Sequence, residues 1–123
     1  MTTLKALALA FAALLSFALP ALGHDERGPN GGQLADAGPY HGELVTRQNT
    51  VHFFLLDTKN KPVSVAGYKA VATLTVGGKS QRIVLEPLGD SRLSGTAEQP
   101  LGTNAKGVIQ LTGPDGKTIQ AKY

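Results

Sequence analysis

An all-β fold is the class that the sequence predicts, and three observations support it. Short apolar runs with the two-residue period of a strand recur along residues 33–123. Turn-forming residues separate these runs at intervals of about eight to twelve residues, which is typical of a sandwich or a barrel. Beyond residue 23 no stretch has a convincing helical period.

The amino-terminal segment has the features of a signal peptide. Lys5 precedes an almost wholly apolar run, Ala6–Leu19. The segment Ala21–Gly23 places small residues at the −3 and −1 positions of a cleavage site, so we expect cleavage before His24. Cleavage after Ala18 is the weaker alternative, because it would leave an apolar tail. An uncleaved anchor is less favoured, since the run is shorter than the roughly 20 residues that span a bilayer.

The composition of the mature chain restricts its chemistry. Loss of Lys5 reduces the 12 Lys and Arg residues to 11, against 9 Asp and Glu residues, for a net charge of +2. The basic residues are scattered, so we expect no nucleic-acid partner. The sequence contains no cysteine, which excludes disulfides, thiolate metal sites and cysteine nucleophiles. Its single methionine is Met1, which excludes a Met-rich copper(I) site.

The first strands follow from alternation and from turn residues. We expect a short strand at Gln33–Ala37, closed by the sequence AGPY. We expect a hairpin of His41–Arg47 and Thr50–Asp57 around Gln48-Asn49. The continuous apolar run Phe53–Leu56 indicates a strand that is central in a sheet or covered on both faces.

The remaining strands form two further hairpins and a short strand between them. In the segment Tyr68–Val76, Ala70, Ala72, Leu74 and Val76 share one face. Gly77-Gly78 then predicts a two-residue turn with positive φ. The expected strands after it are Lys79–Glu86, with Gln81, Ile83 and Leu85 inward, then Arg92–Ala97, Gly107–Thr112 and Lys117–Tyr123.

These elements predict one immunoglobulin-like antiparallel β-sandwich of about seven to eight strands. A partly closed barrel is the alternative. The expected organisation is a signal peptide at 1–23, a flexible leader at 24–32 and the β-sandwich domain at 33–123. Within the leader, Pro29 stiffens the entry to the fold and Gly31-Gly32 let the backbone turn.

Metal binding is the sharpest chemical hypothesis. Cleavage before His24 would leave a mature amino terminus whose α-amino and imidazole nitrogens chelate one ion together. Such nitrogens suit Cu(II) and, less strictly, Zn(II). His41 and His52 are candidates to complete the site, with Asp25, Glu26 or Glu43 as an oxygen ligand. The sequence has no nucleophile elbow, HExxH motif or phosphate-binding glycine loop, so we expect no enzymatic activity.

Strand geometry restricts how these residues combine. His41 and Glu43 share a strand face about 7 Å apart. If the turn is the two residues Gln48-Asn49, Val45 pairs with His52, so His52 shares that face and lies nearer Glu43 than His41. A turn of odd length would put His52 on the opposite face and end that pairing. Joint ligation by His41 and His52 is therefore disfavoured, whereas Glu43 with His52 is feasible on a diagonal. The competing interpretation is a packed, hydrogen-bonded His52 and no metal.

Several segments carry a resemblance to a known family. They are GPNGGQLADAGPYHGELV at Gly28–Val45, DTKNKPV at Asp57–Val63, ATLTVGGKSQRIVLEPLGDSRLSG at Ala72–Gly95, and the closing hairpin. Together they resemble the N-terminal periplasmic domain of heavy-metal RND efflux adaptor (membrane-fusion) proteins. They are still more similar to small exported proteins of the same pattern, which tend to be encoded beside metal-efflux systems.

The resemblance implies a periplasmic β-sandwich that serves copper- or zinc-type metal homeostasis, with an efflux component as partner. Two departures matter: Asn30 stands where relatives often have histidine, and the chain lacks Met-rich and His-rich tracts. The sequence ends where the adaptors continue, so we expect it not to act as an adaptor itself. The prediction is a non-enzymatic periplasmic accessory protein without a stable membrane anchor after cleavage. The alternative is a metal-independent protein-interaction module of the cell envelope.

Overall fold

The protein is an all-β domain of eight antiparallel strands, which confirms the predicted class. A computed structural model describes residues 27–123. The strands are β1 (Gln33–Ala37), β2 (Tyr40–Arg47), β3 (Thr50–Leu56), β4 (Lys69–Val76), β5 (Lys79–Leu88), β6 (Arg92–Thr96), β7 (Lys106–Thr112) and β8 (Thr118–Lys122). The described part of the chain contains no helix that is long and apolar enough to cross a membrane.

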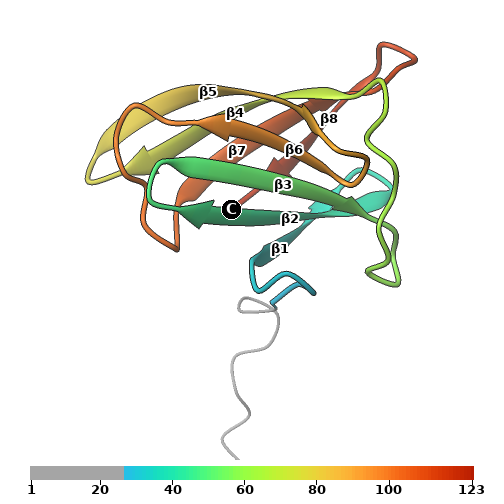
Figure 1. Cartoon of the computed structure of the whole chain (residues 1–123), viewed down its shortest axis with the longest axis horizontal. Helices are drawn as coiled ribbons and strands as arrows, with labels where there is room; N and C mark the ends of the chain where they lie inside the picture. The colour runs from blue at the N-terminus through green and yellow to red at the C-terminus, as the bar shows by residue number, and fades with distance from the viewer. Residues whose placement is uncertain (1–26) are drawn as a thin grey trace, which may run out of the picture.

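All eight strands belong to one continuous sheet with the order β1-β2-β3-β6-β5-β4-β7-β8. The sheet curls until β1 and β8, the two ends of this order, contact each other (Figure 1). The Tyr123 hydroxyl donates a hydrogen bond of 2.8 Å to the Gly42 carbonyl of β2 and ties the carboxyl end across this closure. The strands thus form a nearly closed sheet, and the immunoglobulin-like sandwich stays a prediction.

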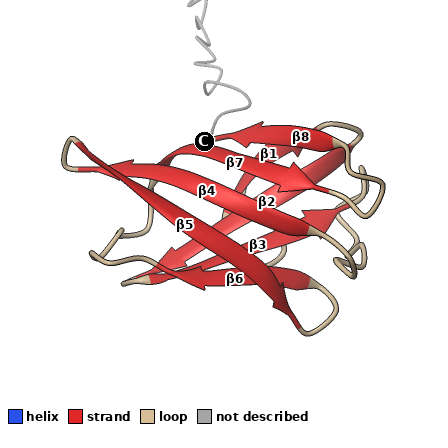
Figure 2. Cartoon of the chain, turned by 90° about the horizontal axis from the view of Figure 1, so that it is seen from above, coloured by secondary structure: helices blue, strands red, loops and turns tan. Residues whose placement is uncertain are grey.

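Strand β5 connects the two halves of the molecule. Its first part pairs with β4 as far as the Ala70–Leu85 partners, and its last part pairs with β6 from the Glu86–Ser94 partners onward. Figure 2 shows β5 crossing diagonally between its two neighbours. The strand runs two residues beyond its expected end and includes Pro87. Proline is tolerated there because β4 no longer pairs with β5, so no ladder hydrogen bond is lost on that side.

The core lies inside the curled sheet and follows the predicted alternation. Ala70, Ala72 and Leu74 of β4 are buried, as are Ile83 and Leu85 of β5. Phe53 is the largest fully buried side chain, and its neighbour across β2 and β3 is Leu44. Full burial of such a side chain stabilises the fold by about 1.5–3 kcal/mol. Without disulfides, this core is the main source of stability.

The turns match the residues that the sequence places in them. Gly77 and Gly78 have φ values of 61° and 80°, as a two-residue hairpin turn requires. Gln48, at the β2–β3 turn, also has a positive φ, of 54°. This two-residue turn fixes the pairing of Val45 with His52 and of Glu43 with Phe54, as the sequence predicts. The β2–β3 hairpin therefore determines that Glu43, Val45 and His52 share one face of the sheet.

Candidate functional site

Glu43 lies on the outer face of β2, yet its side chain is 0% exposed because the turn at residues 28–32 covers it. The Asn30 and Gly32 backbone N–H groups each donate to Oε2 at 2.8 Å. The Asn30 side-chain amide donates to Oε1 at 2.9 Å. Three donors thus satisfy both carboxylate oxygens, and such bonds to a charged group stabilise by about 1.5–3 kcal/mol each.

The glycines of the segment GPNGG are required by this arrangement. A Cβ atom at Gly28 would lie 2.3 Å from Glu43 Cδ. A Cβ atom at Gly32 would lie 2.4 Å from the Leu44 carbonyl oxygen. The turn therefore closes directly onto the carboxylate and the β2 backbone. Residues 28–32, the part of the predicted leader that the sequence assigns to the entry of the fold, are held against β2 by these hydrogen bonds.

His41 is held by polar neighbours on two sides. Its Nδ1 lies 2.9 Å from Asn60 Oδ1, in the loop after β3. Its Nε2 lies 3.8 Å from Oδ1 of Asp36, its partner across β1 and β2. The ring thus links β1 to the loop after β3, and both of its nitrogens face oxygen atoms of the fold.

His52 occupies a different environment on the same outer face. Its Nδ1 is buried and has no hydrogen-bond partner among the described residues. Burial lowers the pKa of His52 below its usual 6.5, and the positive charges of Arg92 and Arg47 lower the pKa further. The ring lies against Phe54, with ring centroids 6.3 Å apart. His52 is therefore a largely neutral imidazole in a positive environment at pH 7.

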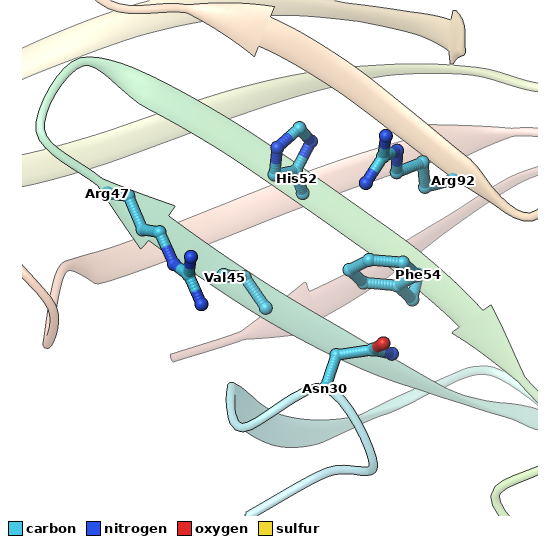
Figure 3. A pocket seen from close by; sticks show the side chains of 6 residues that line it. All are labelled: Asn30, Val45, Arg47, His52, Phe54 and Arg92. Carbon is cyan, nitrogen blue, oxygen red and sulfur yellow. The ribbon is translucent and has the colours of Figure 1, made fainter. Parts of the chain in front are cut away.

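A hollow of about 200 Å³ opens beside His52. We call it the basic hollow, and it is lined by Asn30, Val45, Arg47, His52, Phe54 and Arg92. Figure 3 shows His52 between the two arginines, with Val45, Phe54 and Asn30 along the other side. Within residues 27–123, neither arginine has a carboxylate within 4.0 Å. The hollow therefore presents two unneutralised guanidinium groups above an apolar floor.

A second hollow of about 190 Å³ adjoins the first and extends the positive surface. It shares Asn30, Val45 and Arg47 with the basic hollow and adds Arg27. Arg47 thus stands between the two hollows. Arg47 and Arg92 line the basic hollow, and Arg27 and Arg47 line the second hollow.

Three of the four predicted metal ligands, His41, Glu43 and His52, lie within the described residues, and each has other neighbours there. Within residues 27–123, no group of three or more His, Asp or Glu side chains is placed to hold a metal ion. Glu43 is enclosed by its donors, His41 faces Asn60 and Asp36, and His52 lies beside arginines that repel a cation. His24, the first of the predicted ligands, lies outside the described residues, as does the predicted signal peptide 1–23.

Asn30, Arg47 and Arg92 line the site, and none of them is among the site residues expected from the sequence. Arg47 follows Val45 by two residues and therefore shares the face of His52. The register of the β2–β3 hairpin could thus have predicted that Arg47 lies near His52. Arg92 reaches the site because β6 pairs with β3, placing Arg92 opposite Phe54. That pairing joins strands that are not consecutive, and no local pattern indicates it.

Comparison of the chain with models of known protein families, with curated proteins and with solved structures gives no match.

Proposed function

We propose that the chain is a non-enzymatic accessory protein of the periplasm that serves heavy-metal homeostasis or efflux as a binding module. Its contact surface is the outer face of β2, β3 and β6. One observation carries the proposal: the basic hollow holds charged side chains that the described fold leaves without a carboxylate partner. Groups that the fold does not use are available for another molecule.

Other features are consistent with this role. The signal-peptide pattern supports export, and the resemblance to efflux adaptor domains supports a component of a metal-efflux system as partner. The absence of cysteine and of nucleophile motifs from the sequence supports a non-enzymatic role. The binding face is built on paired strands, which hold the arginines in a fixed register.

Site-specific photo-crosslinking in the host cell tests the proposal. A crosslinking residue replaces Thr96, which is exposed on the outer face of β6 beyond the basic hollow. The matched control replaces Thr73, which is also exposed and lies on β4 in the other half of the molecule. We expect one discrete adduct from position 96 and none from position 73, in cells grown with copper or zinc. Equal labelling from both positions, or none from position 96, contradicts the proposal.

Metal binding at the amino terminus is the second candidate function. It depends on cleavage before His24, which would give one residue two nitrogen donors for Cu(II) or Zn(II). The oxygen contacts of His41 and the three donors to Glu43 favour a site formed mainly by His24 over one that uses the predicted set of four.

Intact mass and metal titration of the exported protein test this second candidate. We expect a first residue of His24 and Cu(II) binding that His24→Ala abolishes but His41→Ala leaves unchanged. A different first residue, or equal binding by the His24→Ala protein, contradicts an amino-terminal chelate.

A further inference from the structure

Given the binding role proposed for this face, we infer that the basic hollow takes a carboxylate from an acidic peptide segment of the partner protein. The group would lie between Arg47 and Arg92, beside His52. Guanidinium groups bind carboxylates through paired, charge-assisted hydrogen bonds, which makes arginine the side chain best suited to this task.

The sheet register places the two arginines on opposite diagonals of His52, on the same outer face. His52 on β3 is flanked by Val45 on β2 and by Ser94 on β6. Arg47 is two residues beyond Val45, and Arg92 is two residues before Ser94, so each arginine is a diagonal neighbour of His52. Their backbones are fixed by ladders on both sides of β3. A ligand therefore meets arginines whose backbone positions are set before it binds, and only their side chains have to be ordered.

The lining favours an organic anion over an inorganic one. Val45 and Phe54 form an apolar floor between the arginines, and the Phe54 side chain is only partly buried. A carboxylate carried on carbon atoms can cover this floor, whereas phosphate would leave it exposed to water. The hollow of about 200 Å³ is large enough for the end of an acidic side chain.

The adjoining hollow indicates an extended ligand rather than a single small acid. It continues past Arg47 to Arg27, so the Arg27 guanidinium can bind a second carboxylate of the same peptide. Asn30 forms the rim between the two hollows. Its backbone N–H and its side-chain amide are both fixed by Glu43, so this rim is held in place by the fold.

His52 makes the binding dependent on pH. The charged groups facing it are Arg47 on β2 and Arg92 on β6, while Glu86 on β5 lies on the same face beyond Ser94. Glu43 lies on this face too but is enclosed by the turn at residues 28–32. A bound carboxylate favours protonation of His52, so by linkage the affinity rises as the pH falls through the pKa of His52.

Titration of the mature protein with acidic peptides, followed by NMR of the backbone amides, tests the inference. The probe is an acetylated, amidated peptide Gly-Asp-Glu-Asp-Gly, and its matched control is Gly-Asn-Gln-Asn-Gly. Inorganic phosphate is a separate arm. We expect the acidic peptide to shift the amides around Val45, His52 and Arg92, with tighter binding at about pH 5.5 than at about pH 7.5. We expect the amide peptide to shift none.

Variants separate a specific site from general charge attraction. Arg47→Gln and Arg92→Gln should each weaken peptide binding about tenfold, since each removes a charge-assisted contact. Lys79→Gln removes one exposed charge at the distant β4–β5 turn and should change the affinity less than about twofold. His52→Gln should remove the pH dependence. Unchanged thermal unfolding of each variant shows that its fold is retained.

Three results would overturn the inference. They are equal weakening by Arg92→Gln and Lys79→Gln, shifts spread over the whole surface, and tighter binding of phosphate than of the acidic peptide. If one of these results is obtained together with a discrete crosslink from position 96, the proposed binding role is retained and the carboxylate site is contradicted. Peptide binding without a crosslink would remove the proposed partner contact instead.

Discussion

At the scale of single residues, the outer face of β2 and β3 holds two polar side chains that differ in hydrogen bonding. The Glu43 carboxylate accepts hydrogen bonds from three donors. It cannot contact a ligand unless the turn at residues 28–32 unfolds. His52, which shares that face, has a buried Nδ1 with no partner among residues 27–123. The hydrogen bonds of the described residues thus use both carboxylate oxygens of Glu43 but leave His52 Nδ1 without a partner.

Glu43→Gln should lower the free energy of unfolding by about 2 kcal/mol, because an amide replaces one acceptor with a donor that faces other donors. Denaturant unfolding measures this loss. Glu98→Gln is the control, since Glu98 is exposed and should change stability by less than about 0.5 kcal/mol. Equal effects from the two variants would show that the turn at residues 28–32 does not depend on the carboxylate.

The pKa of His52 should lie below 6.5 in the free protein, and Arg92→Gln should raise it, because Arg92 repels the protonated ring. NMR titration of the ring protons measures both values. The unfolded chain binds this proton more readily, so His52 reduces stability as the pH falls below 6.5 toward its folded pKa. A pKa at or above 6.5 in the free protein would contradict both the burial of the ring and its repulsion by the arginines.

At the scale of elements, local patterns predict most of the strands and turns. Alternation marks the inward residues of β4 and β5, and Gly77-Gly78 marks the turn between them. The two-residue turn at Gln48-Asn49 also predicts the register of β2 with β3. The expectation that β5 ends before Pro87 is wrong, because β5 changes neighbours at that point and continues.

The β4–β5 turn offers a direct test of its conformation. Gly77 has a φ of 61°, and a Cβ atom added there would have no neighbour within 4 Å, so only backbone strain opposes a side chain. Gly77→Val should reduce the free energy of unfolding by about 1–2 kcal/mol, whereas Gly77→Asn should cost far less, since asparagine tolerates this region. Thermal unfolding of both variants distinguishes them. Equal losses would argue against a turn with positive φ at this position.

At the scale of the whole molecule, the candidate site depends on contacts that no local pattern predicts. The pairing of β3 with β6 brings Arg92 to His52 from a distant part of the sequence. The glycines of residues 28–32 indicate an entry to the fold, but nothing in the sequence shows that this turn covers Glu43. Alternation gives the face of a residue and says nothing of the loops that cover that face.

The closure of the sheet is a second property of the whole molecule, and substitution of Tyr123 tests it. Tyr123→Phe removes the hydrogen bond to Gly42 and should cost about 1 kcal/mol. Hydrogen exchange should then become faster in β8 and β1, where the sheet closes, while β4 and β5 keep their protection. Uniformly faster exchange in all strands would contradict a local role for this contact.

The central claim is that the basic hollow is the functional surface of the protein, and one measurement tests it most directly. The pKa of His52 is followed by NMR without ligand and with saturating Gly-Asp-Glu-Asp-Gly peptide. A carboxylate beside the ring offsets the repulsion from Arg47 and Arg92, so the pKa of His52 should rise when the peptide binds. The ring-proton chemical shifts of His41, outside the hollow, should not change when the peptide is added. An unchanged pKa of His52 at saturation, or peptide-induced shifts of the His41 ring as large as those of the His52 ring, would contradict the claim.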